Sequence, residues 1–161
     1  MCGSIPWIAS WITFSGFSAL SFSSGYAAAV GALGALCREG DVIILDKLCH
    51  ASLIDGARLS GATLRVFPHN HLGKLESHIE WARTNHPDGR ILVVTEAVFS
   101  MDGNVADVPA LLGLCERHDA WLMIDDAHGF GVLGAHGEGT LAHHGIVGTD
   151  GVSPNWRGRL D

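Results

Sequence analysis

The chain has 161 residues, of which 47% are hydrophobic and 17% charged, and its formal net charge is −7. This composition is typical of a globular protein with a sizeable core, and it excludes a disordered chain. The ten Lys and Arg residues are scattered, so the sequence predicts no basic patch and no nucleic-acid partner. The four cysteines have no metal-ligand spacing, which favours reduced thiols and a cytoplasmic location.

The first 37 residues contain no Asp, Glu, Lys or Arg. Ser and Gly interrupt every apolar run, whereas a membrane-spanning helix needs about 20 mostly apolar residues. We therefore expect neither a signal peptide nor a membrane span. Residues 1–18 match no pattern and form a separate, unassigned segment.

From residue 19 onward, helices and short apolar strands alternate. Strands are predicted at residues 41–46, 63–67, 90–95 and 121–124, and helices at residues 26–37, 51–60, 72–85 and 108–118. Ser24 or Gly25 is positioned to cap the first helix and Asp107 the last. This alternation predicts an α/β domain over residues 19–147, with a doubly wound, mostly parallel sheet and helices on both faces.

Reactive side chains follow three of the predicted strands. In open α/β sheets, ligands bind beyond the carboxyl ends of the strands. The exit at 47–50 contains His50, the exit at 95–103 contains Glu96 and Ser100, and the exit at 125–131 contains Asp125, Asp126 and His128. Adjacent carboxylates at the end of an apolar strand are costly unless a cation meets them, and a protonated pyridine nitrogen is one such cation. The imidazole of His50 could lie flat over a planar ring. The histidines at 69, 71, 143 and 144 have no partner motif and are expected to lie in solvated loops.

Four segments resemble the α-oxoamine synthases, which are fold-type-I enzymes that depend on pyridoxal 5'-phosphate (PLP). They read SSGYAA (23–28), LCHASLIDGARLSGA (48–62), VVTEAVFSMDG (93–103) and WLMIDDAHGFGVLG (121–134). They occur in the family's order, and the resemblance extends over residues 20–147. Members condense an amino acid with an acyl thioester, release carbon dioxide and form homodimers. The DDAHGFGVLG segment is most similar to the biotin-pathway branch, which uses L-alanine and a pimeloyl thioester of coenzyme A or of a carrier protein.

The resemblance implies that the chain is part of a PLP-binding large domain, and it implies roles for seven residues. Catalytic roles fall on His50 and Glu96. Cofactor-binding roles fall on Gly25 and Tyr26 at the phosphate, His50 over the ring, Asp125 at the ring nitrogen, and Ser100 and His128 at the ring oxygen.

The sequence departs from the family after His128. The family attaches its cofactor to a lysine about 30 residues past this histidine. This sequence has only Lys47 and Lys74, both upstream, and places Arg157 near that spacing. Arginine stays protonated and cannot form a Schiff base. We therefore expect residues 148–161 to be a divergent tail, the chain to be an incomplete copy of the enzyme, and this chain alone to be inactive.

Other interpretations use the same residues. The chain could be a non-catalytic PLP-binding protein, or another α-oxoamine synthase such as a 2-amino-3-ketobutyrate CoA ligase. A metal-dependent hydrolase could use Asp125, Asp126 and His128, but it would need further carboxylates at comparable strand ends. The glycines at 129, 131 and 134 match a dinucleotide-binding motif, but the segment after them is too rich in glycine to open a helix.

Overall fold

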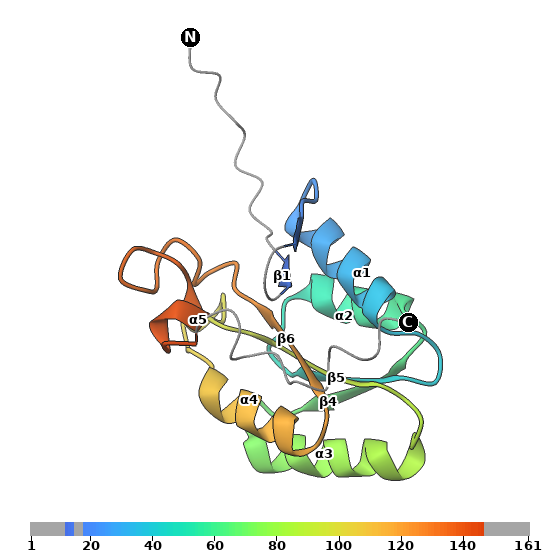
Figure 1. Ribbon diagram of the computed structural model, residues 1–161. Coiled ribbons are helices and arrows are strands. Elements are labelled where there is room, and N and C mark those ends of the chain that lie inside the picture. Colours follow the sequence, from blue (N-terminus) through green and yellow to red (C-terminus); the bar gives the residue numbers. More distant parts are fainter. Residues whose placement is uncertain (1–11, 15–17, 147–161) are drawn as a thin grey trace.

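The computed structural model describes residues 12–14 and 18–146 (Figure 1). Residues 1–11, 15–17 and 147–161 lie outside the described residues, and with them Arg157 and the expected divergent tail. The elements in chain order are β1 (Ile12–Phe14), β2 (Ser18–Leu20), α1 (Gly25–Leu36), β3 (Val42–Asp46), α2 (Ala51–Leu59), β4 (Thr63–Phe67), α3 (Leu72–Asn85), β5 (Ile91–Glu96), α4 (Val108–Arg117), β6 (Trp121–Asp125) and α5 (Thr140–His143).

Four strands form a parallel sheet in the order β4-β3-β5-β6, and β1 and β2 form a separate antiparallel pair. The chain passes from β3 to β4 on one side and then crosses back to β5 on the other side. The direction of winding therefore reverses between β3 and β5, which is where open α/β sheets leave a crevice for ligands. The predicted α/β class and the doubly wound parallel sheet are confirmed.

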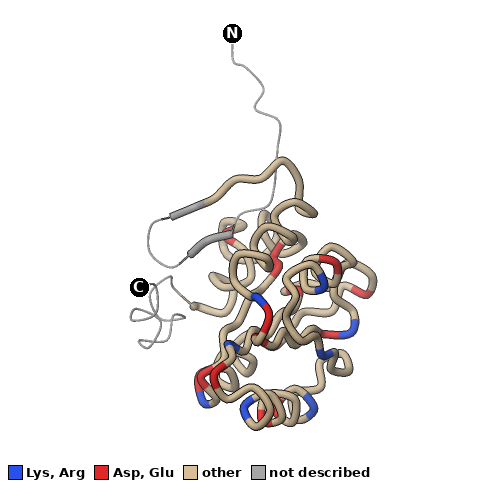
Figure 2. The backbone as a smooth tube through the Cα atoms, turned by 90° about the vertical axis from the view of Figure 1, so that its right-hand side faces the viewer, with Lys and Arg blue, Asp and Glu red and all other residues tan. Residues whose placement is uncertain are grey.

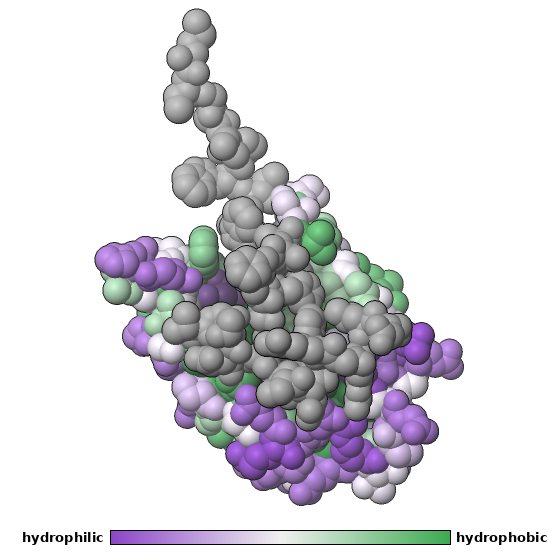
Figure 3. All heavy atoms as spheres, viewed as in Figure 1, coloured by the Kyte–Doolittle hydropathy of each residue, from purple (hydrophilic) through white to green (hydrophobic). Residues whose placement is uncertain are grey.

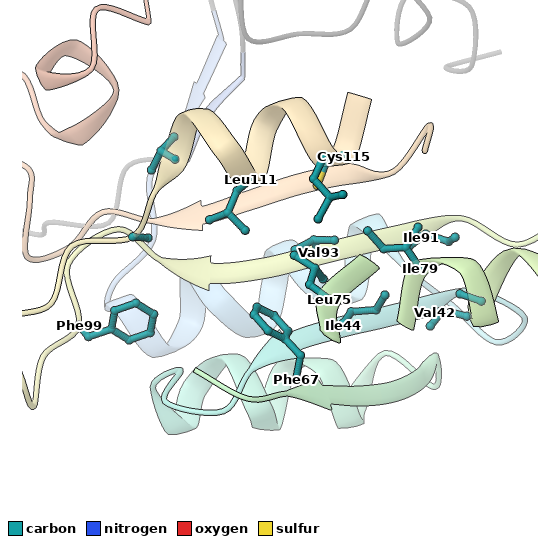
Figure 4. Packing of buried hydrophobic residues seen from close by; sticks show 14 residues of the cluster. Val42, Ile44, Phe67, Leu75, Ile79, Ile91, Val93, Phe99, Leu111 and Cys115 are labelled. Carbon is teal, nitrogen blue, oxygen red and sulfur yellow. The ribbon is translucent and has the colours of Figure 1, made fainter. Parts of the chain in front are cut away.

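Helices cover both faces of this sheet, α1 and α2 on one face and α3 and α4 on the other (Figure 1). Strand β3 shows how the sequence fills both cores. Val42 and Ile44 pack against α3 and α4, whereas Ile43 and Leu45 pack against α1 and α2. Because successive strand residues point to opposite faces, a strand covered on both sides must be apolar throughout. Figure 4 shows the core beneath α3 and α4, where Phe67, Leu75, Val93, Leu111 and their neighbours meet.

The eight predicted helices and strands are all present, with ends that differ by at most one residue. The Ser24 side chain accepts the Ala27 N–H at 3.1 Å, and Asp107 caps α4 through the Ala110 N–H at 3.1 Å. Both caps satisfy amide groups that a helix leaves unpaired in its first turn. The short elements β1, β2 and α5 were not predicted.

From Arg38 onward, charged residues of both signs are interspersed along the described chain (Figure 2). Hydrophilic residues cover the lower part of the view in Figure 3, where α3 lies in Figure 1, because α3 buries Leu75, Ile79 and Ala82 and turns its charged side chains outward. Helix α1 contains no charged residue. Within the described ranges, no helix combines the length and the apolar character that crossing a membrane requires.

Candidate functional site

The polar strand exits meet on the α1/α2 face of the sheet, at its carboxyl edge. Glu96 and Asp125 are register partners at the ends of β5 and β6, so their side chains share a face. That face is the one covered by α1 and α2, because Leu92 and Val94, four and two residues before Glu96, belong to the core beneath those helices. His50 opens α2 directly after β3 and therefore lies at the same edge.

The first turn of α1 lies at this edge as well. The guanidinium of Arg90, just before β5, donates to the carbonyl oxygen of Leu36, which places the end of α1 at the amino edge of the sheet. A 12-residue helix is about 18 Å long. Gly25 and Tyr26 therefore lie toward the carboxyl edge, where the first amide groups of α1 can meet an anion. The Tyr26 hydroxyl donates to Asp55 Oδ2 at 3.3 Å, and this carboxylate raises the pKa of Tyr26.

Glu96 joins two of the strand exits through its carboxylate. Its Oε1 accepts the backbone N–H of His50 at 2.5 Å, and its Oε2 accepts the backbone N–H of Ser100 at 3.2 Å. The residue is only 2% exposed. A buried carboxylate must be hydrogen-bonded, and here backbone amides supply the donors.

The two adjacent acidic residues at the end of β6, Asp125 and Asp126, have different partners. Asp126 holds Thr140 at the start of α5, accepting the hydroxyl at 2.5 Å with Oδ1 and the backbone N–H at 2.8 Å with Oδ2. A Cβ atom at Gly129 would overlap these same groups, so the turn after β6 closes tightly around Asp126. Asp125 uses Oδ1 to accept the Ala127 N–H at 3.0 Å, and no other described residue donates to its side chain.

The imidazole and hydroxyl groups of the site are accessible. His50 is exposed, and its Nδ1 lies 2.8 Å from Ser52 Oγ and accepts the Ser52 N–H at 3.2 Å, which orients the ring. Ser100 and His128 are also exposed. In the part of the chain that the structure describes, their side chains make no hydrogen bond and are available to a ligand.

The site carries two neighbouring carboxylates on one sheet face, at Glu96 and Asp125. Among the described residues, no ion pair with Lys, Arg or His involves either of them. Like charges at paired positions of neighbouring strands favour a cationic group beside them. Together with the amide groups of α1 and the exposed imidazoles, the arrangement suits a planar cationic ring that carries an anionic substituent.

One buried cluster supports these exits and was not predicted. Asp46 is 2% exposed, and its Oδ1 accepts the Leu48 N–H at 2.8 Å and lies 3.1 Å from His69 Nδ1. The His69 ring in turn contacts Phe99 edge to face, with 4.4 Å between centroids, directly before Ser100. His69 does lie in the turn after β4, but its side chain packs within this cluster, so the expectation that it is solvated was wrong. The charge at the end of the buried strand β3 was the signal for this cluster, because a buried carboxylate requires donors.

His71 also has a structural role, since its side chain caps α3 by accepting the Lys74 N–H at 3.2 Å. His143 and His144 lie at the end of α5 with their rings 5.1 Å apart. Over residues 12–14 and 18–146, no three His, Cys, Asp or Glu side chains come together in a group that could hold a metal ion.

The family model described as aminotransferase class I and II matches residues 8–151. The 8-amino-7-oxononanoate synthase 1 of Polaromonas sp. is 55% identical over 136 residues, which are 84% of this chain and 32% of that relative. Among solved structures, the serine palmitoyltransferase of S. paucimobilis with bound PLP and myriocin has a TM-score of 0.72 and 29% identity, covering 86% of this chain and 33% of its own. The 8-amino-7-oxononanoate synthase of Francisella tularensis has a TM-score of 0.64 and 35% identity, covering 78% of this chain and 34% of its own. This chain thus spans about a third of the length of the relatives it matches.

Proposed function

Since the chain belongs to the aminotransferase class I and II family, we propose that its carboxyl-edge cluster is the PLP site of an acyltransferase similar to 8-amino-7-oxononanoate synthase. The relatives that it matches are α-oxoamine synthases, and PLP is the cofactor of this group. The observation that carries the proposal is the pair of neighbouring carboxylates, Glu96 and Asp125, on the face that also presents His50.

The residues present fit PLP part by part. Asp125 keeps one carboxylate oxygen for the protonated ring nitrogen, and His50 offers an oriented imidazole to the ring face. The hydroxyl of Ser100 and the imidazole of His128 are exposed and suited to the ring oxygen. The backbone amides of Gly25 and Tyr26 would hold the phosphate at the positive end of α1.

Bound PLP supplies an electron sink that stabilises negative charge beside the amino group of an amino-acid substrate. The Asp125 carboxylate would keep the proton on the ring nitrogen. His50 would exclude water from one face of the ring and orient the amino acid. We propose L-alanine and a pimeloyl thioester as substrates, with release of carbon dioxide, as the step of biotin synthesis that the relatives' name implies. We further propose that the complete enzyme is a cytoplasmic homodimer.

PLP titration of the purified chain tests the site, followed by absorbance and by circular dichroism of the cofactor band. We expect reversible binding that Asp125→Asn weakens at least about tenfold, because the amide cannot form a charge-assisted bond to the ring nitrogen. Asp88→Asn is the matched control, since Asp88 is exposed in the loop before β5, at the other edge of the sheet. Absence of PLP binding by the unaltered chain, or equal affinities for both variants, would contradict the proposal.

Two alternatives give different results in the same samples. A 2-amino-3-ketobutyrate CoA ligase would bind PLP equally well, but glycine and not L-alanine would perturb the spectrum of the bound cofactor. A metal-dependent hydrolase would lose activity with a chelator and would be indifferent to PLP.

A further inference from the structure

We propose that Glu96 is a positioning residue that holds His50 and Ser100 at a set separation around the cofactor, and that it exchanges no proton with the substrate. This inference rests on the proposed PLP site and assigns a task to one residue of it. Resemblance alone suggests a catalytic role for Glu96, and the contacts of its carboxylate favour the positioning role.

Both oxygens of Glu96 are occupied. Oε1 accepts the N–H of His50 at 2.5 Å and Oε2 accepts the N–H of Ser100 at 3.2 Å. With 2% of the residue exposed, a substrate could reach the carboxylate only after one of these hydrogen bonds opened. A proton on either oxygen would also weaken that oxygen as an acceptor for the backbone N–H that it binds.

The two amides belong to segments that are far apart in sequence. His50 lies 46 residues before Glu96 and is the first residue of the turn into α2, whereas Ser100 lies four residues after it in the exit of β5. One rigid carboxylate therefore sets the distance between the backbone of the ring-stacking residue and the backbone of the hydroxyl donor. The negative charge also lies at the N-terminus of α2, where the helix dipole favours it.

The arrangement requires a carboxylate of this length. The amide of Gln has one oxygen, and its NH2 group would face the second backbone N–H donor to donor. Asp keeps the charge but is one methylene shorter, so it cannot reach both amides from the same backbone position. Glu96→Gln and Glu96→Asp thus separate the effect of charge from the effect of geometry.

Amide hydrogen exchange of the full chain without PLP tests the coupling directly. We expect Glu96→Gln to speed exchange at both His50 and Ser100 by about tenfold or more, since charge-assisted hydrogen bonds are lost at both sites. Glu80→Gln, on the exposed face of α3, is the matched control and should leave both rates unchanged. Unchanged exchange in Glu96→Gln would overturn the proposal. If that variant does not fold, the exchange rates of the unaltered chain provide the test. We expect the His50 and Ser100 amides to be protected from exchange to the same degree, and an unprotected amide at either residue would overturn the proposal.

PLP binding then separates positioning from a purely structural role. We expect both Glu96 variants to weaken PLP binding about tenfold and to reduce the circular dichroism of the bound cofactor, which reports its fixed orientation. Wild-type affinity and dichroism in Glu96→Gln, despite faster exchange, would show that the coupling does not serve the cofactor. Wild-type values in Glu96→Asp would show that charge alone suffices. If the unaltered chain binds no PLP, the proposed function fails, and the exchange rates alone decide whether Glu96 couples the two segments.

Discussion

Removing the Asp126 side chain should destabilise the chain much more than removing that of its neighbour Asp125. Asp126→Ala deletes two hydrogen bonds to Thr140, at 2.5 Å and 2.8 Å. Thr140 is fully buried, with 0% exposure, so its hydroxyl and its amide would be left without their acceptor. Asp125→Ala deletes only the hydrogen bond to the exposed Ala127 N–H at 3.0 Å.

The magnitude follows from these contacts. Hydrogen bonds to a charged group contribute about 1.5–3 kcal/mol each, and Asp126 is itself partly exposed, so we expect a total loss of about 3 kcal/mol. In a chain of this size each kcal/mol lowers the unfolding midpoint by about 2–4 °C, which gives about 6–12 °C. For Asp125→Ala the corresponding loss is about 1 kcal/mol or less.

Thermal unfolding followed by far-ultraviolet circular dichroism measures the difference, and a double-mutant cycle locates it. Thr140→Val should cost less than Asp126→Ala, and the double variant should cost about the same as Asp126→Ala, because both changes break the same contact. Equal midpoints for Asp125→Ala and Asp126→Ala, or additive effects of Asp126→Ala and Thr140→Val, would refute the assignment of Asp126 as the residue that closes the loop.

Three further outcomes are expected. Phe67→Ala should lower the free energy of unfolding by about 3–5 kcal/mol, because Phe67 is 1% exposed in the core. Val66 is 49% exposed on the same strand, so Val66→Ala should lower it by less than about 1 kcal/mol. Urea titrations measure both values, and similar losses for the two variants would contradict the assigned core. Burial raises the pKa of the Cys37 and Cys115 thiols from 9.0 to about 12, so above pH 9 the unfolded chain loses these protons first. The free energy of unfolding should then fall with rising pH, by up to about 1.4 kcal/mol per pH unit for each thiol, and a double Cys→Ala variant with an equally steep slope would argue against this origin. After borohydride reduction with stoichiometric PLP, mass spectrometry should detect no covalent PLP adduct, because the sequence has only Lys47 and Lys74 and neither matches the family's lysine. A stoichiometric adduct at either residue would contradict this expectation.

Local patterns were sufficient to predict most of the fold. The run at 42–46 is apolar except at its end because both of its faces are covered, and residues such as Asp107 cap helices through neighbours three positions away. The short helix α5 escaped prediction because its start is held by Asp126, which lies 14 residues earlier in the chain. Nothing within its own four residues indicates a helix.

The sequence by itself determined the family, the order of the strands along the chain, and which strand exits carry acidic, imidazole and hydroxyl groups. Only the tertiary structure decided what each group does. The register of β5 with β6 makes Asp125 a neighbour of Glu96, whereas the side chain of Asp126 holds Thr140 at the start of α5. The winding of the chain brings the His50 amide to a carboxylate 46 residues away. Such roles depend on which face a side chain takes and which distant segment packs there, and both are properties of the assembled sheet.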